Sequence, residues 1–281
     1  MSQRTEVRRA IEVERQAIDV RQAIGVVVSN DWVNDRYKHM TVCVPGLAQV
    51  SQPGQFFHLL CGVDSAGPLL RRPMSVYKMD PLRNEIHFLY HVKGEGTQLL
   101  AQRQGGDPLD LVGPLGQGFT LNSRWHRVLV VARGVGMATL APLVAVARRR
   151  EMAVDVILSA RTPRDILGAR EFAAMGAHVF PVTDEDGSSD LATLQSRVEA
   201  LVDQGQTDAL FTCGSARLTR MLRDVAIRRG LPGQVAVEEH MACGIGMCQG
   251  CTRVFRRDGK DVHLRVCQEG PVFPLEEVVY P

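Results

Sequence analysis

Four cysteines near the end of the sequence constrain its fold more than any other feature. They are Cys243, Cys248, Cys251 and Cys267, so that the first three follow a C-x4-C-x2-C pattern and fifteen residues separate the fourth. This is the spacing of plant-type [2Fe–2S] sites, in which four thiolates hold two irons. The sequence therefore predicts a [2Fe–2S] cluster with these four residues as metal ligands.

The residues around these cysteines fit such a site. Three glycines keep the loop free of side chains, so that backbone N–H groups can point at the sulfides. Residues 252–255 and 262–266 alternate like strands about an Asp258-Gly259 turn, and a hairpin there returns Cys267 to the other three. Structural zinc, which prefers paired C-x2-C knuckles, and simple disulfides are the alternatives.

Composition limits what else the chain can do. A net charge of +2 and an aromatic content of 5% give no electrostatic or stacking basis for nucleic-acid binding. No apolar run approaches the ~20 residues of a membrane span. Residues 1–24 lack the apolar core of a signal peptide, and an odd count of seven cysteines without one favours reduced thiols. We therefore expect a soluble, cytoplasmic protein.

The pattern of apolar, charged and turn-forming residues along the sequence predicts four segments. Residues 1–21 form a charged N-terminal extension, in which Val7, Ile11 and Ile18 fit either a short amphipathic helix or a loosely ordered arm. Residues 22–122 contain short β-rich stretches between turn residues, which is typical of an antiparallel barrel or sandwich. The expected strands are 23–28, 40–44, 56–60, 74–78, 85–92 and 109–111.

The second half of the chain alternates strands with helices. Residues 123–234 predict a parallel α/β sheet, and residues 235–281 a small cluster-binding domain. The fold class is therefore multidomain α+β. The expected strands are 127–132, 154–159, 178–183 and 208–213, and the expected helices are 137–150, 163–175 and 190–201.

A glycine turn follows the first strand of the α/β segment. Gly134 and Gly136 stand where a strand meets a helix, a place suited to the pyrophosphate of NAD(P)H, although the third glycine of the dinucleotide fingerprint is absent. Cys213-Gly214 ends a later strand at the same carboxyl edge. Arg161 offers a cation for the nucleotide ribose, or is an ordinary solvated charge.

Residues in the β-rich half suit a flavin. The stretch Arg72-Pro73-Met74-Ser75 puts a guanidinium and a hydroxyl around a rigid proline, and a glycine turn with Gly96 and Thr97 suits an anion. A surface arginine and an ordinary turn are the alternatives. Because a nicotinamide gives a two-electron hydride and the cluster moves single electrons, a flavin between them is expected.

Together these residues resemble the ferredoxin–NADP reductase superfamily and, within it, the electron-transfer subunits of type B dihydroorotate dehydrogenases. The match spans about residues 22–280, and its most specific pieces include residues 72–75, 94–97, 113–119, 238–251 and 266–273. The resemblance implies a Greek-key β-barrel for FAD, an α/β domain for NAD(P)H and a C-terminal [2Fe–2S] module. It implies that residues 72–75 bind the flavin ring and phosphate, that Leu89, Tyr90 and His91 lie along FAD, and that Gly96 and Thr97 hold its pyrophosphate.

The resemblance also implies a partner. An FMN-containing catalytic subunit of the dihydroorotate dehydrogenase type would exchange electrons with this chain in a hetero-oligomer. A reductase subunit of a hydrogenase- or oxygenase-type system is one alternative, and a zinc-stabilised, non-enzymatic interaction module is another. The chain departs from the family where Arg133 precedes Gly134 and where the charged extension stands before residue 22.

Overall fold

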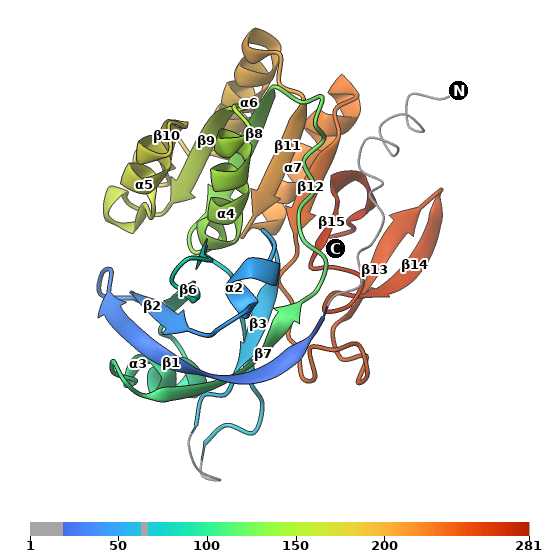
Figure 1. Ribbon diagram of the computed structural model, residues 1–281. Helices are drawn as coiled ribbons and strands as arrows, with labels where there is room; N and C mark the ends of the chain where they lie inside the picture. Colours follow the sequence, from blue (N-terminus) through green and yellow to red (C-terminus); the bar gives the residue numbers. More distant parts are fainter. Residues whose placement is uncertain (1–18, 63–66, 281) are drawn as a thin grey trace.

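The computed structural model describes residues 19–62 and 67–280 as two large sheets and a small hairpin, and the half-barrel lies below the α/β domain in Figure 1. The helix or arm predicted for the N-terminal extension falls on residues 1–18 and so lies outside the described residues. No helix within the described part of the chain is long and apolar enough to span a membrane.

The first sheet is an antiparallel half-barrel with the strand order β4-β3-β7-β1-β2-β6-β5. Side chains on one face of each strand point into a closed apolar core, which includes Phe57, Phe88 and Leu111. Two short helices, α2 (Leu47–Val50) and α3 (Glu95–Ala101), accompany it. The strands are β1 (Arg21–Trp32), β2 (Tyr37–Cys43), β3 (Phe56–Leu59), β4 (Arg72–Ser75), β5 (Lys78–Asp80), β6 (Glu85–His91) and β7 (Pro108–Leu115).

One expected strand, 74–78, is two strands in the structure. β4 pairs with β3, whereas β5 pairs with β6 at the opposite edge of the sheet. Buried Val76 and Tyr77 carry the chain from one edge to the other. The prediction was wrong here because a continuous apolar stretch does not reveal a change of hydrogen-bonding partner.

The second sheet has the order β10-β9-β8-β11-β12-β15 and is parallel except for its last strand. The central strands β8, β9 and β11 are buried on both faces, which explains their continuous apolar runs in the sequence, whereas the edge strand β10 is partly exposed. The strands are β8 (Arg127–Arg133), β9 (Ala153–Ala160), β10 (His178–Thr183), β11 (Ala209–Cys213), β12 (Gly233–Ala236) and β15 (Val272–Pro274).

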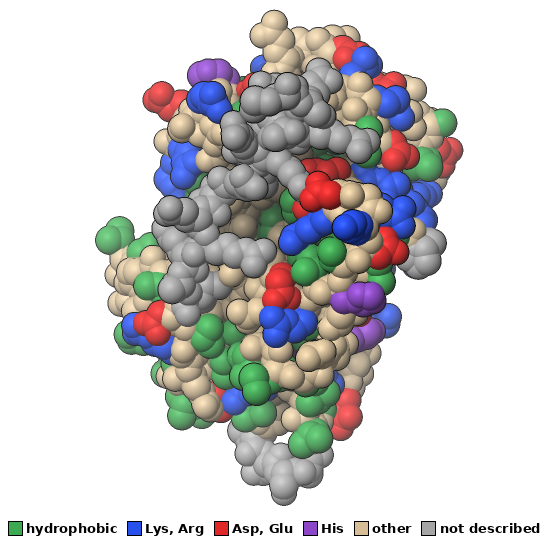
Figure 2. Space-filling view, turned by 90° about the vertical axis from the view of Figure 1, so that its right-hand side faces the viewer, with side chains coloured by type: hydrophobic (Ala, Val, Ile, Leu, Met, Phe, Trp, Pro, Cys, Tyr) green, Lys and Arg blue, Asp and Glu red, His purple; other side chains and the backbone are tan. Residues whose placement is uncertain are grey.

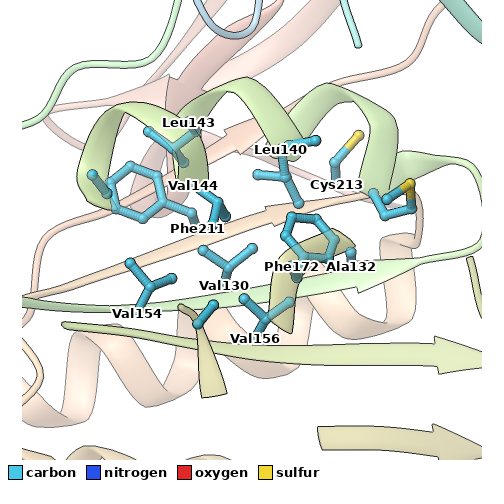
Figure 3. Close-up of a cluster of buried hydrophobic side chains, with 14 of the residues drawn as sticks. Val130, Ala132, Leu140, Leu143, Val144, Val154, Val156, Phe172, Phe211 and Cys213 are labelled. Carbon is cyan, nitrogen blue, oxygen red and sulfur yellow. The ribbon is translucent and has the colours of Figure 1, made fainter. Parts of the chain in front are cut away.

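Helices cover both faces of this sheet. Figure 3 shows Leu140, Leu143 and Val144 of α4 over Val130 and Phe211 of the strands, in one buried cluster. The other face carries α6 and α7, which bury Leu194, Val198, Leu222 and Val225. The helices are α4 (Gly136–Arg149), η1 (Pro163–Asp165), α5 (Ala169–Ala174), α6 (Leu191–Gly205) and α7 (Ala216–Arg229).

The helix expected at 163–175 is interrupted. η1 ends before Ile166, whose backbone is extended, and α5 starts after Gly168, which has a φ of 74°. Helix α7 was not predicted, although both of its ends carry a capping residue. Ser215 caps its start by accepting a hydrogen bond from the Leu218 N–H, and Gly230, with a φ of 64°, ends it.

The predicted C-terminal hairpin is present as β13 (Thr252–Arg257) and β14 (Lys260–Arg265), which pair antiparallel. The chain then returns to the α/β sheet, where β15 pairs with β12 and η2 (Leu275–Glu277) follows. The predicted segment 235–281 thus contains the cluster loop and hairpin together with an edge strand of the neighbouring sheet.

Candidate cofactor sites

The four cysteines of the C-terminal segment come together as two pairs. The N–H of Cys248 donates to Sγ of Cys243 at 3.4 Å, and the N–H of Cys267 donates to Sγ of Cys251 at 3.4 Å. The thiols are also hydrogen-bonded within each pair. Among residues 19–62 and 67–280, no three His, Cys, Asp or Glu side chains are grouped as ligands of one metal ion.

This arrangement fits a two-iron centre better than a single ion, because such a cluster needs four thiolates shared between two irons. All seven cysteines are free thiols, so the disulfide alternative is not realised in this structure. The identity of the four ligands stays a prediction that the donor set supports.

The two pairs differ in their electrostatics. Burial raises the pKa of Cys243, but N–H groups of Cys248, Ile245 and Met247 outweigh this and bring it down to about 7. Burial, together with a hydrogen bond to Cys251, raises the pKa of Cys267 to about 12. A metal must therefore displace a proton from Cys267, which forms the inner pair with Cys251, whereas Cys243, which forms the outer pair with Cys248, is already close to the thiolate form.

Two side chains that the sequence analysis missed hold this loop. Arg265 donates from Nη1 to the carbonyl of Gly246 at 2.9 Å and forms an ion pair with Glu269. His58 of β3 lies under Gly244, where a β-carbon would be 2.8 Å from the imidazole ring. The positive φ angles of both glycines, 71° and 83°, explain why the loop needs them.

The predicted flavin residues lie together on the half-barrel. Arg72, Pro73, Met74 and Ser75 form the edge strand β4, and each is half-buried. A β-carbon at Gly96 would lie 2.9 Å from Nε of Arg72, so this guanidinium lies directly against the first turn of α3. A cation over backbone N–H groups is a suitable cradle for a phosphate group.

The hydroxyl of Thr97 is used within its own turn. It accepts hydrogen bonds from the N–H groups of Lys93 and Gly94, and donates to the carbonyl of Gly94 at 2.8 Å. Thr97 therefore shapes the turn that carries Gly96, and its contact with a pyrophosphate stays a prediction.

The three residues predicted to lie along the flavin do not face the same way. Leu89 packs on the side of the α/β domain, and the His91 ring lies 4.9 Å from that of Tyr37. Tyr90 points into the half-barrel core, where its hydroxyl donates to Asn30 at 2.9 Å. A flavin contact at Tyr90 would have to come from its backbone.

The nucleotide turn is built from two strand ends that touch. A β-carbon at Gly136 would lie 2.6 Å from the carbonyl oxygen of Cys213, and one at Gly214 would lie 2.4 Å from that of Arg133. Gly214 also has a φ of 99°. The structure thus brings Gly134, Gly136, Cys213 and Gly214 together at the carboxyl edge of β8 and β11, where open α/β sheets bind ligands.

Arg133, the cation in which this turn departs from the family, is held by an ion pair and a hydrogen bond. Its Nη2 forms an ion pair with Asp184 at 2.6 Å, and its Nη1 donates to Ser159 at 2.7 Å. The hydrogen bond from Arg133 is the main reason that the pKa of Asp184 lies below its usual value. Arg161 lies at the end of β9 with an exposed side chain, so its two alternatives stay open.

Glu238 is a further group that the sequence analysis did not single out. The thiol of Cys213 lies 4.0 Å from its Oε1, and burial raises the pKa of this carboxyl. The Glu238 side chain is nevertheless accessible to solvent. The Glu238 carboxyl is thus reached by solvent although protein surrounds most of it, and it lies beside Cys213 at the end of β11.

Ion pairs join the half-barrel to the α/β domain. The carboxylate of Glu171 on α5 accepts from both Tyr77 and Lys78. Arg36, in the β1–β2 turn, pairs with Asp165 of η1. The two halves that carry the predicted flavin and nicotinamide residues are thus held in one orientation.

Comparison with known proteins gives a consistent picture. Residues 238–279 match the family described as the iron-sulfur cluster binding domain of dihydroorotate dehydrogenase B. The chain is 35% identical over 242 residues to the electron transfer subunit of dihydroorotate dehydrogenase B (NAD(+)) of Desulforamulus reducens, covering 86% of this chain and 92% of that protein. The same identity extends over 258 residues with the corresponding subunit of Geobacillus thermodenitrificans, covering 90% and 96%.

Solved structures show the same fold. A chain from the structure of the NADH-dependent reduced ferredoxin-NADP oxidoreductase has a TM-score of 0.75 at 24% identity, covering 92% of this chain and 90% of that chain. The ferredoxin reductase of carbazole 1,9a-dioxygenase has a TM-score of 0.59 at 20% identity, covering 76% and 66%. The half-barrel followed by a parallel α/β domain is therefore a ferredoxin reductase-like arrangement, as the sequence predicted.

Proposed function

Because the chain belongs to the family of electron-transfer subunits of dihydroorotate dehydrogenase B, an oxidoreductase, we propose that it carries electrons between NAD(H) and a catalytic partner through FAD and a [2Fe–2S] cluster. When bound, FAD exchanges a hydride with a nicotinamide and single electrons with an iron–sulfur centre, which is the chemistry that these groups supply. The protein would bind these groups, orient them and set their reduction potentials.

The observation that carries this proposal is the contact between the cluster loop and the flavin strand. Gly244, next to the first cysteine, packs on His58 of β3. His58 pairs in register with Pro73, in the middle of the predicted flavin strand β4. Two segments far apart in the sequence thus meet across a single strand, which suits direct electron transfer between the groups that they hold.

The half-barrel residues would hold FAD. The guanidinium of Arg72 and the turn at Gly96 supply positive charge and backbone N–H groups for the pyrophosphate. Pro73, Met74 and Ser75 form a half-buried strand edge against which a planar ring can lie. The backbone at residues 89–91 would border the same ring.

The α/β domain would orient the nicotinamide nucleotide. Gly134 and Gly136 would let the chain approach a pyrophosphate at the start of α4, and the pair of Cys213 and Glu238 lies at the end of β11, where a nicotinamide ring would enter. Because Arg133 is neutralised by Asp184, this turn has no free cation at that position for an additional phosphate, which favours NADH.

The cluster loop would also face the partner. Ile245 and Met247 lie between cluster ligands and are 47% and 78% exposed. Figure 2 shows one side of the molecule, where hydrophobic side chains are scattered over the lower half among charged ones. We propose that an FMN-containing catalytic subunit docks on the loop, and that the assembly works in the reducing cytoplasm, where thiols persist.

A visible spectrum of the full chain tests the proposal. The protein is reconstituted without oxygen with FAD, iron and sulfide, and we expect flavin and iron–sulfur absorption that NADH bleaches. Metal analysis should find iron and not zinc. A colourless, zinc-containing protein would rule the proposal out, and bleaching by NADPH alone would contradict the assignment of NADH.

A further inference from the structure

His58 is a buried polar side chain of the half-barrel that lacks hydrogen-bond partners. Its side chain is 1% exposed, and neither Nδ1 nor Nε2 has a hydrogen-bond partner among the described residues. Buried imidazole nitrogens are costly to leave unpaired, and each such group in a native protein calls for an explanation. The half-buried histidines His39 and His87 of the half-barrel do have partners, since Nε2 of His39 and Nδ1 of His87 lie 3.0 Å apart.

The strand pleat directs His58 away from the half-barrel core. Phe57 and Leu59 point into that core, whereas Phe56 and His58 share the opposite face, with ring centroids 5.7 Å apart. On that face the His58 ring meets the cluster loop. A β-carbon at Gly244 would lie 2.8 Å from both Cε1 and Nε2, and 3.0 Å from Nδ1.

The charge around His58 suits a negatively charged neighbour. Arg71, whose Nη2 pairs with Asp110 at 2.7 Å, lies close enough to act on the ring. Burial, reinforced by this arginine, lowers the pKa of His58 to about 4. In either protonation state the imidazole carries at least one N–H that can donate a hydrogen bond.

We propose that His58 is a positioning residue of the iron–sulfur centre, whose ring N–H donates a hydrogen bond to a sulfur atom of the bound cluster or of its Cys243 ligand. The proposal rests on the proposed function, since it requires the cluster to be present. A donor at the sulfur stabilises the extra negative charge of the reduced state, so His58 raises the reduction potential of the cluster. Because His58 also pairs with Pro73, the same residue links the cluster to the flavin strand.

The first test measures the reduction potential of the cluster. In His58→Phe a ring of similar size remains but the donor is lost, and we expect the midpoint potential, followed by EPR in the reconstituted full chain, to become more negative. His58→Gln restores a donor and should recover part of the shift. His39→Phe, at a half-buried histidine with its own partner, should leave the cluster potential unchanged. An unaltered potential in His58→Phe would overturn the proposal.

The second test uses the wild-type chain and so does not depend on a variant that folds. The protein is labelled with ¹⁵N-histidine and the reduced cluster is studied by pulsed EPR. We expect a weak coupling between the cluster spin and a histidine nitrogen, and its absence in a chain with an intact cluster signal would refute the role of His58. Absence of any iron–sulfur signal would instead refute the proposed function itself.

Discussion

The cluster loop and the nucleotide turn are both glycine-rich, but their glycines have different tasks. In the cluster loop, Gly244 and Gly246 adopt positive φ angles that wrap the chain around four thiols. In the nucleotide turn, Gly136 and Gly214 allow two strand ends to pack backbone against backbone. The first set shapes the loop that would hold a cluster, whereas Gly136 and Gly214 are needed for the packing of the strand ends whether or not a nucleotide binds, although both sets look alike in a sequence.

The largest effect is expected at a cluster ligand. In Cys248→Ser a thiolate of the outer pair is lost, and the iron–sulfur absorption and bound iron should disappear while flavin binding persists. The stability of the α/β domain should change little, since Cys248 is exposed. Cys43→Ser, at a thiol of the half-barrel, is the matched control and should keep its iron. Unchanged iron content in Cys248→Ser would show that the ligand assignment is wrong.

A substitution in the nucleotide turn should act on stability, with or without a nucleotide. In Gly136→Val the new β-carbon would lie 2.6 Å from the carbonyl oxygen of Cys213, a backbone atom that cannot move aside cheaply. We expect the free energy of unfolding to fall by about 3 kcal/mol, as in other overpacked sites. Urea unfolding of the chain without nucleotide measures it.

The control for this variant is Gly94→Ala, since nothing lies within 4 Å of a β-carbon at that position. Its loss of stability should stay below about 1 kcal/mol. If the two variants proved equally stable, the close packing of the ends of β8 and β11 would not be the reason that position 136 requires glycine.

A smaller effect is expected for the charge beside the nucleotide turn. In Asp184→Asn the carboxylate that neutralises Arg133 is lost, and Arg217, 3.9 Å away, loses its neighbour as well. The freed positive charge should favour NADPH relative to NADH by roughly five-fold in kcat/KM, the scale of a partly exposed ion pair. Asp203→Asn, which removes a surface pair with Arg229, is the control. A ratio equal in both variants would exclude Arg133 as a determinant of nucleotide choice.

The sequence predicted the iron–sulfur domain, with which the family match agrees, because the four cysteines are close along the chain and their spacing is typical of a metal centre. The strands β8, β9 and β11 were predicted because burial on both faces leaves continuous apolar runs, whereas the short parallel strand β12 was not predicted. Local patterns of this kind need no knowledge of the fold.

The parts that were missed depend on contacts between distant segments. The neutralisation of Arg133 requires Asp184, 51 residues away, and no local pattern indicates that the two meet. His58 looks like any histidine in a strand until β3 packs against the cluster loop. The crossing of the chain from β4 to β5 was missed because it depends on which strands pair, and the pattern of side chains does not indicate the pairing.

The return of β15 to the α/β sheet has a consequence for how this protein can be altered. Ala236 of β12 and Val272 of β15 are paired, and the N–H of Val237 donates to the carbonyl of Pro271 at 2.8 Å. The predicted cluster segment thus leaves the sheet and re-enters it at one pair of neighbouring strands. A different electron outlet inserted between these two strands would keep both chain ends in place, but it would also have to fit His58 of the half-barrel and Glu277 of η2, which contact the present segment.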